Sequence, residues 1–542
     1  ILVIDASSGI EIGTERAWDM LEELGSPRII FINKTDKENI NTKALLGEVQ
    51  ERFSKSACEI KLPFSSALTE TIAESDDALL EKYLDGKEIK EDELKKALKK
   101  AVLEGKIYPV IMGSAQTDAG VKELLDCIVD DMPSPIERKP ITGITFSEEA
   151  PLSGLVFKSV SDPFVGQLTI FRLFSGRLAS NTGFLNSKTG AKERIGSLLI
   201  LQGKEQRAVQ SASCGDIVAV AKLKDTHLGD SISDEKKPIV FEPFVFPEPV
   251  YSSSIRPKTR QDEEKISEAL SKLCSSDATL KTSRDSQTKE LVLSGMGDQH
   301  IDVMVKRLKE RFHVEVEIGT PKIPYKETIK KGAKAQGKHK KQSGGRGQYG
   351  DVWLELNPLE RGKNFEFVDK IVGGAIPRNF IPSVEKGVKN AMVEGVITSF
   401  PMVDVKVTVY DGSYHDVDSS DIAFQIAGAL AFRKAVMEAS PILLEPIMDV
   451  EITVPEDCMG MIPADLNSRR GRVLGVEARS KNETIKAKVP LAEMYRYATD
   501  LRSMTGGRGS YVMHYSHYEE VPSRIAQGII AQNPKHKTQE EE

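Results

Sequence analysis

A short polar motif that follows an apolar run is well suited to recognise a purine base. Asn33, Lys34 and Asp36 come directly after Arg28–Ile32, which has the composition of a buried strand. An Asp here can accept hydrogen bonds from N1–H and the exocyclic amine of guanine, an Asn can reach the N7/O6 edge, and the Lys stem can cover the ring. Adenine would leave the carboxylate desolvated and unpaired. The motif therefore predicts a guanine-binding loop.

A second loop strengthens this interpretation by its position. Three fixed residues at about 5% each occur by chance in roughly one of fifteen chains of this length, so the first motif needs support. Gly113-Ser114-Ala115 follows the apolar run Tyr108–Met112 and precedes a helical segment from about Ala119. In guanine-nucleotide proteins a loop of small residues here sets a backbone N–H against O6 of the base. Because ligands of open parallel sheets bind at the carboxyl ends of the strands, the two loops are expected to meet.

The phosphate-binding half of such a site is absent from this sequence. No G-x-x-x-x-G-K-[ST] occurs in the 542 residues, so no P-loop, magnesium-holding Ser/Thr or water-positioning residue can be named. We therefore predict no catalytic residue and no metal ligand in this chain, and no GTP hydrolysis by the chain as written. Ile1 lies inside an apolar run that is typical of a buried strand, and the missing elements are expected upstream of it.

Positive charge is concentrated in a few segments. Lys326–Arg346 holds seven Lys and one Arg against the single Glu327, and Ser343–Gly347 adds glycines that let backbone N–H groups approach phosphates. The segment is either a solvated loop or a phosphate-contacting surface. Arg469–Arg472 is a further basic cluster, for which a solvated face is the alternative to nucleic-acid contact.

Two further loops carry polar residues and special backbone positions, at Gly373–Pro377 and at Asp411–Asp416. His415 has no carboxylate or nucleophile partner implied by its spacing, so a catalytic role is not expected. Its neighbours suit a loop tip that forms hydrogen bonds and stacks, as RNA recognition requires.

The whole-chain composition excludes several classes of protein. Hydrophobic residues make up 39% and charged residues 29%, which excludes collagen, coiled-coil rods and wholesale disorder. The sequence holds no apolar run of 18 residues, and its five scattered cysteines include no C-x-x-C, which indicates a reduced cytosolic protein without a zinc site. The net charge of −7 alone argues against nucleic acid, but the local basic segments decide the partner.

The pattern of elements indicates a multidomain α/β and α+β protein. Up to about Pro133, short β-branched runs alternate with helical stretches, which predicts a parallel sheet, and the charged helical stretch Asp76–Glu104 looks like an insertion. Glycine-punctuated short strands over 152–242 predict a β-barrel. Helices and strands then alternate in three α+β units, and the polar Lys535–Glu542 run is expected to be disordered.

Longer stretches resemble the elongation factor G family, in the same order along nearly all of the chain. The matching stretches are Asp5…Ser8-Gly9…Thr14-Glu15, Asn33–Asp36, Pro109-Val…Gly113–Ala115, Asp162–Gly166, Gly215–Val218, Gln342–Gly350, Tyr410–Ser420 and Tyr497–Ser503.

This resemblance implies a domain for each part of the chain. The expected parts are 1–136, the C-terminal part of a GTP-binding domain with a partial P-loop-GTPase-type parallel sheet and a helical insertion at about 44–106; 137–245, the β-barrel domain II; 246–323, a ferredoxin-like domain III; 324–446, the tRNA-mimic domain IV; 447–522, a ferredoxin-like domain V; and 523–542, a C-terminal tail.

The resemblance also implies a function and the residues that serve it. It implies a cytoplasmic, monomeric, ribosome-dependent GTPase that binds GTP/GDP and Mg²⁺ and promotes movement of tRNA and mRNA. Asn33, Lys34, Asp36, Ser114 and Ala115 would hold guanine. The ribosome and tRNA contacts of the domain IV tip would be Gly373, Gly374, Ile376, Pro377, Ser413, Tyr414, His415 and Asp416.

Three stretches depart from the usual pattern of the family: Lys338–Lys341 is more basic, Ser276–Ala278 lacks a proline, and Cys458–Pro463 is atypical. These differences favour, as an alternative, a paralogue that acts in ribosome recycling or protection. The absent P-loop leaves open a ribosome-binding module without its own catalysis.

Overall fold

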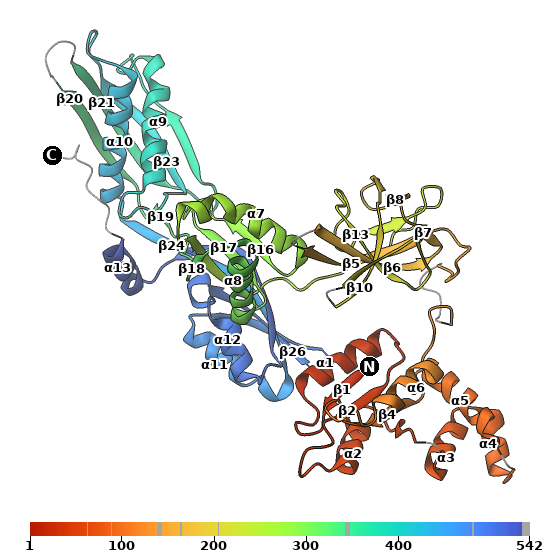
Figure 1. Ribbon diagram of the computed structural model, residues 1–542. Coiled ribbons are helices and arrows are strands. Elements are labelled where there is room, and N and C mark those ends of the chain that lie inside the picture. The colour runs from red at the N-terminus through yellow and green to blue at the C-terminus, as the bar shows by residue number, and fades with distance from the viewer. Residues whose placement is uncertain are drawn as a thin grey trace. The chain divides into compact units, whose positions relative to one another are not determined.

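The computed structural model describes residues 1–61, 63–87, 89–137, 144–162, 165–203, 205–341, 347–479 and 482–533. Two compact units, Ile1–Val245 and Phe246–Glu542, make up the chain (Figure 1). The glycine-rich stretch 342–346 and the polar run 535–542, both singled out in the sequence, lie outside the described residues. In the described part of the chain, no helix combines the length and apolarity that a membrane span requires.

The first unit begins with a four-stranded parallel sheet in the order β1-β2-β4-β3. Its central strands are built from fully buried residues such as Ile30, Ile32 and Val110, which explains the apolar runs. The predicted parallel sheet is thus confirmed. The elements are β1 (Leu2–Asp5), α1 (Ile12–Glu23), β2 (Ile30–Asn33), β4 (Tyr108–Met112) and α6 (Val121–Asp131).

The segment predicted as a helical insertion is helical over most of its length, but it also supplies the edge strand of the sheet. Ala57 is fully buried and pairs with Tyr108, so that β3 extends the sheet beyond β4. The elements are α2 (Thr42–Arg52), β3 (Ala57–Glu59), α3 (Ser66–Glu74), α4 (Asp77–Leu84) and α5 (Glu91–Leu103). The last three helices share a core that includes Leu68, Ile72 and Leu98.

The rest of the first unit is rich in β-structure, as the spacing of its glycines predicts. Eight strands form one sheet in the order β11-β10-β13-β6-β5-β14-β8-β9, and β12 pairs with β7. The strands are β5 (Ser153–Asp162), β6 (Gly166–Ser175), β7 (Arg177–Ala179), β8 (Gly183–Asn186), β9 (Lys192–Arg194), β10 (Leu198–Gln202), β11 (Glu205–Val209), β12 (Ser211–Ser213), β13 (Ile217–Ala221) and β14 (Ser231–Ser233).

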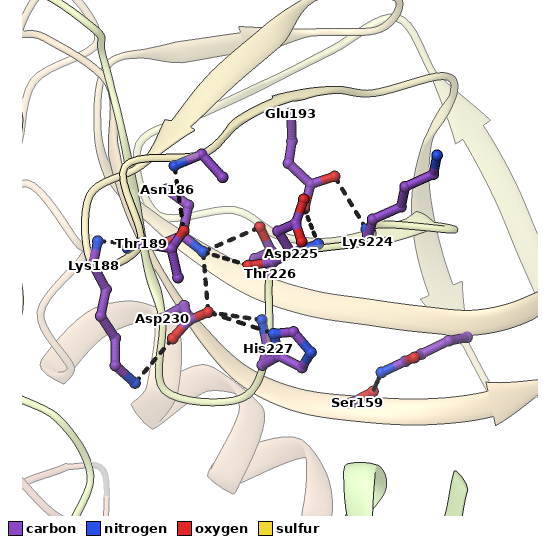
Figure 2. Close-up of polar contacts among 12 residues, drawn as sticks. Ser159, Asn186, Lys188, Thr189, Glu193, Lys224, Asp225, Thr226, His227 and Asp230 are labelled. Carbon is purple, nitrogen blue, oxygen red and sulfur yellow. Dashed lines mark hydrogen bonds and ion pairs between the residues drawn. The ribbon is translucent and has the colours of Figure 1, made fainter. Parts of the chain in front are cut away.

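A buried polar network fixes the loops at one end of these strands (Figure 2). Asp230 accepts hydrogen bonds from the His227 backbone N–H (2.8 Å) and from Asn186 Nδ2 (3.0 Å), and it pairs with Lys188 Nζ at 3.1 Å. Burial acts to raise the pKa of Asp230, but these hydrogen bonds outweigh it and hold the pKa below its ordinary value. The internal partners account for the polar groups of Asp230, so the network is structural.

The second unit contains two βαββαβ arrangements with the same strand order. The sheets run β16-β17-β15-β18 and β25-β26-β24-β27, the order of a ferredoxin-like fold. The first arrangement comprises β15 (Tyr251–Pro257), α7 (Arg260–Ser276), β16 (Lys281–Arg284), β17 (Leu291–Gly295), α8 (Asp298–Phe312) and β18 (Val316–Gly319). The second comprises β24 (Pro441–Pro455), η2 (Glu456–Cys458), α11 (Met461–Ser468), β25 (Arg472–Arg479), β26 (Asn482–Pro490), η3 (Leu491–Glu493), α12 (Tyr497–Met504) and β27 (Ser510–Glu520), followed by α13 (Ser523–Gln532).

Between them lies an α+β part whose sheet has the order β20-β21-β23-β22. Helices α9 and α10 pack on each other and cover one face of this sheet (Figure 1). The elements are β19 (Lys326–Ile329), β20 (Ala333–Lys341), β21 (Gln348–Pro358), β22 (Phe365–Asp369), η1 (Arg378–Phe380), α9 (Ile381–Glu394), β23 (Val405–Ser413) and α10 (Asp421–Glu438). Much of the basic run 326–346 is therefore strand rather than a solvated loop.

A buried carboxylate ties this part together. Glu327, which has no exposed surface, accepts backbone hydrogen bonds from Val396 (2.7 Å), Ile397 (3.0 Å) and Thr398 (2.8 Å), and one from the Thr398 hydroxyl (2.6 Å). The charge is compensated by four donors, as a buried carboxylate requires. Strand β19 is thereby joined to the loop that follows α9.

Replacing this carboxylate by an amide should destabilise the second unit. In Glu327→Gln an NH₂ group faces N–H donors, so we expect the free energy of unfolding to fall by about 3 kcal/mol or more. Hydrogen exchange of the α9 and α10 amides measures this loss. The matched control is Glu366→Gln, which removes an exposed ion pair with Lys406 and should cost less than about 1 kcal/mol. Equal exchange in both variants would contradict the role of Glu327.

Candidate functional site

Two loops at the carboxyl edge of the parallel sheet are joined by hydrogen bonds. Asn33 Oδ1 accepts from the Ala115 N–H at 2.9 Å. The backbone N–H and the hydroxyl of Thr35 both donate to the Gly113 carbonyl, at 3.2 Å and 3.1 Å. The predicted meeting of the residues 33–36 and 113–115, called the base loops below, is therefore present.

The bond from Ala115 changes which groups face a ligand. The sequence predicts that a backbone N–H of this loop is directed at O6 of a base, but the Ala115 N–H is occupied by Asn33. Because Asn33 uses its oxygen in this bond, its Nδ2 group remains as the donor for an acceptor such as N7 or O6. Ser114 is 1% exposed and its N–H donates to the Ala119 carbonyl, so it shapes the loop from within.

The lysine of the motif is held by a carboxylate on the neighbouring strand. Lys34 has a φ of 65°, and its ammonium group forms an ion pair with Asp5, the last residue of β1. The hydrogen bond to Lys34 is the main cause that holds the pKa of Asp5 well below its usual range, and it raises the pKa of Lys34. The pair fixes the end of the lysine while the stem spans the rim of the site.

Asp36 is the exposed acceptor of the base loops. Its side chain has no hydrogen-bond partner among the described residues. Both carboxylate oxygens can therefore accept from two adjacent donors on one ring edge, which is the arrangement that N1–H and the C2 amine of guanine present.

The close approach of the two loops requires glycine at two positions. A Cβ on Gly113 would lie 2.2 Å from the Ala119 carbonyl oxygen and 2.8 Å from Phe31 Cζ. Gly120 has a φ of +73°, and a Cβ there would lie 2.3 Å from the Met112 carbonyl oxygen. These glycines let the turn fold back on the end of β4.

A cavity of about 660 Å³ lies behind the base loops. Thr35, Met112 and Gly120 line it, but Asn33, Lys34, Asp36 and Ala115 do not. Its other walls come from the segment after β3 and from α5 and α6, so it is distinct from the edge that Asn33 and Asp36 present.

The second predicted site comprises the loops 373–377 and 413–416, which are called the tip loops below. Gly373 and Gly374 have φ values of 68° and 75° with open space around them. Ile376, in contrast, is 1% exposed and packs so closely on Gly412 that a Cβ there would lie 2.6 Å from its side chain. Predicted as a contact residue, Ile376 instead anchors one tip loop to the sheet, because an apolar side chain at this point completes the core.

Ser413 also has a mainly internal role, since it is the last residue of β23. Its hydroxyl lies 2.8 Å from the Tyr349 hydroxyl and donates to Asp351 at 3.0 Å. Tyr414, His415 and Asp416 follow as exposed residues, as the sequence predicts.

His415 organises the tight turn that follows it. Its Nδ1 accepts from the backbone N–H groups of Val417 (3.3 Å) and Asp418 (3.2 Å) and lies 3.4 Å from an Asp418 carboxylate oxygen. Nε2 is therefore the ring atom available to an external partner.

Models of protein families match five consecutive parts of this chain. The models that match are the elongation factor Tu GTP binding domain at residues 1–134, elongation factor G domain 2 at 151–235, elongation factor G domain III at 246–320, elongation factor G domain IV at 321–440 and the elongation factor G C-terminus at 442–529. The chain belongs to the elongation factor G family. Its architecture is that of a translational GTPase. Membership of this family implies binding of GTP or GDP and interaction with the ribosome.

A solved structure agrees with this assignment. The crystal structure of the protein ttk003000868 from Thermus thermophilus is 38% identical to this elongation factor G family member, with a TM-score of 0.75. The similarity covers 98% of this chain and 84% of that chain.

The carboxylates of this family member do not assemble a metal site in the part of the chain that the structure describes, where no group of three or more His, Cys, Asp or Glu could hold an ion. The base loops retain the two kinds of group that a guanine edge requires, the Asn33 amide nitrogen as donor and the Asp36 carboxylate as acceptor.

The arginine cluster in domain V has an internal role. Arg470 donates to Glu445 at 2.5 and 2.9 Å and to Glu493 at 2.9 Å, and Arg469 pairs with Asp465 and Asp500. Both guanidinium groups are largely buried. Neither predicted alternative, a solvated face or nucleic-acid contact, describes these two residues.

One residue of the base site was missed by motif reasoning. Asp5 forms an ion pair with Lys34. Its position at the carboxyl end of β1, the strand next to β2 in a parallel sheet, is the feature that could have identified it as a residue of the site.

The close contact at Gly113 predicts a matched pair of glycine variants. Gly113→Ala should lower the free energy of unfolding by about 1–3 kcal/mol, because backbone must shift to admit the methyl group. Gly47→Ala, in α2 with nothing within 4 Å, should raise it by about 0.5–1 kcal/mol. Urea unfolding followed by the buried Trp18, in a Trp353→Phe background, measures both. Similar changes in the two variants would show that the base loops tolerate a wider separation.

Proposed function

We propose that the full-length protein is a ribosome-dependent GTPase elongation factor that promotes translocation of tRNA and mRNA. The supporting observation is that one chain combines the paired base loops with a domain IV in which Ile376 of one tip loop packs against Gly412, next to the other tip loop. A nucleotide site and a separate RNA-contacting tip are what coupling of GTP turnover to movement requires.

In this proposal Asn33 and Asp36 recognise the base, Lys34 covers it, and Ser114 and Ala115 shape the pocket wall. Phosphate binding, Mg²⁺ ligation and hydrolysis are assigned to a segment upstream of Ile1, because no P-loop occurs in this sequence. The tip residues that would contact the codon–anticodon region are the half-buried Pro377 and the exposed Gly373, Gly374, Tyr414, His415 and Asp416.

Ribosome recycling or protection by a paralogue is the alternative. Lys338, Lys340 and Lys341, in the stretch that departs from the family pattern, are exposed and form no ion pair with a described residue. A toeprint assay separates the functions, since only a translocase advances the mRNA by one codon. Ribosome binding without that advance would favour the alternative.

Changing the acceptor at Asp36 should change base preference. Asp36→Asn replaces an acceptor by a donor, so we expect weaker binding of GDP and a shift in preference toward XDP, whose C2 group is an acceptor. Competition binding of the two nucleotides measures the shift. Glu38→Gln, another exposed acidic residue two positions on, is the control that should leave the preference unchanged. If Asp36→Asn keeps its affinity for GDP, the base loops are not the base pocket.

Truncating His415 should slow translocation without affecting chemistry. We expect His415→Ala to slow the toeprint shift by about tenfold, the equivalent of a lost interaction of about 1.4 kcal/mol. Ribosome-stimulated GTP hydrolysis by the full-length protein should stay close to the wild-type rate. His514→Ala, an exposed histidine of domain V, is the control. Loss of hydrolysis together with the shift would contradict a tip role.

A further inference from the structure

In the part of the chain that the structure describes, no helix covers the second face of the domain IV sheet. Residues alternate across each strand, and Ala335, Leu354 and Val409 pack in the core beneath α9 and α10. The alternate positions of β20, β21 and β23 point to the other side, called the open face below. Its residues include Lys334, Lys338, Lys340, Tyr349, Trp353 and Tyr410.

Aromatic rings are gathered on the open face. The rings of Trp353 and Tyr410 lie with their centroids 6.4 Å apart and tilted by 54°. A register shift between Trp353 and Leu354 leaves Tyr410 as an extra residue of β23, which brings its ring beside the tryptophan. Tyr349 lies four positions before Trp353 on the same side, about 13 Å away along the strand.

Lysines flank these rings. Lys334 Nζ lies 5.2 Å from the Tyr410 ring centroid, and Lys338 Nζ lies 5.7 Å from that of Tyr349. Lys334 also pairs with Glu355 at 3.6 Å, whereas Lys338 and Lys340 have no carboxylate partner among the described residues.

The residue opposite Lys338 on the neighbouring strand is Asp351. Asp351 is buried and accepts from Gln336 Nε2 at 2.8 Å and from the Ser413 hydroxyl at 3.0 Å. Its carboxylate oxygens are engaged by these donors, so the exposed ammonium groups of Lys338 and Lys340 remain available to an anion.

We propose that the open face binds single-stranded RNA, with bases stacked on Trp353, Tyr410 and Tyr349 and phosphates near Lys338 and Lys340. Half-buried aromatic rings held by a rigid sheet offer stacking surfaces that a base can use only when it is unpaired. A duplex hides its base faces, so it could use the lysines but not the rings. The chemistry favours RNA over a protein partner because exposed lysines lie beside the rings of Tyr410 and Tyr349.

This inference goes beyond the proposed function, because it concerns free RNA in the absence of ribosomes. If the RNA-binding test fails, the proposed role in translocation still stands. If the toeprint test fails, the proposed RNA binding by the open face still stands.

The experiment is anisotropy of a fluorescein-labelled twelve-nucleotide oligouridylate titrated with the full chain at fixed salt. Trp353→Ala and Tyr410→Ala should each weaken binding by at least about fivefold. Lys338→Gln with Lys340→Gln should weaken it and reduce its salt dependence. Tyr515→Ala, an exposed tyrosine of domain V, is the matched control that should bind as the wild type does.

Conservative variants separate stacking from folding. Trp353→Phe keeps a ring and should retain binding within about twofold, while the quenching of tryptophan fluorescence by RNA is lost, since the remaining Trp18 is buried. Thermal melting identifies variants that have lost their fold. Unchanged binding in Trp353→Ala and Tyr410→Ala would overturn the proposal. Duplex RNA that binds as tightly as the single strand would also overturn the proposal. So would a protein ligand that binds the open face when RNA does not bind it at all.

Discussion

The hydrogen bond from the Ala115 N–H to Asn33 Oδ1 joins two loops that lie 82 positions apart in the sequence. It can form because β2 and β4 are neighbours in a parallel sheet, which brings their carboxyl ends to one edge. The glycine at position 113 removes the side chain that would hold the loops apart. The arrangement of donor and acceptor groups at this edge depends on that one bond, since it decides that Asn33 presents its amide nitrogen outward.

In the second unit, too, single contacts join segments that lie far apart in the sequence. Glu327 joins β19 to the loop after α9, and Ile376 under Gly412 joins one tip loop to the sheet that carries the other. Strand β24 runs without interruption from a pairing with β19 to pairings with β26 and β27. Domain IV and domain V thus share a continuous strand, and two arginines of the basic cluster in domain V form internal ion pairs, Arg470 with Glu445 and Glu493 and Arg469 with Asp465 and Asp500.

Much of the fold could be predicted from local patterns. The apolar runs of β2 and β4 are buried on both faces, so their signal in the sequence is strong, and the apolar run Tyr108–Met112 coincides with β4. The three-residue strand β3 was not predicted, because a strand this short has no period to detect. Long-range partners were also beyond sequence reasoning. The sequence neighbours of Ile376 do not show that its side chain packs in a core. Those of Arg470 do not show that it pairs with Glu445 and Glu493.

The most direct test of the account is titration of the isotope-labelled protein with guanosine, inosine and adenosine, followed at the Asn33 side-chain amide and the Ala115 backbone amide. Nucleosides probe the base loops without a phosphate site. If the base loops recognise guanine, guanosine should change the chemical shifts of both groups. Inosine, which lacks the C2 amine, should change them less, and adenosine should leave them unchanged. Equal shifts with adenosine, or guanosine shifts confined to other residues, would contradict it.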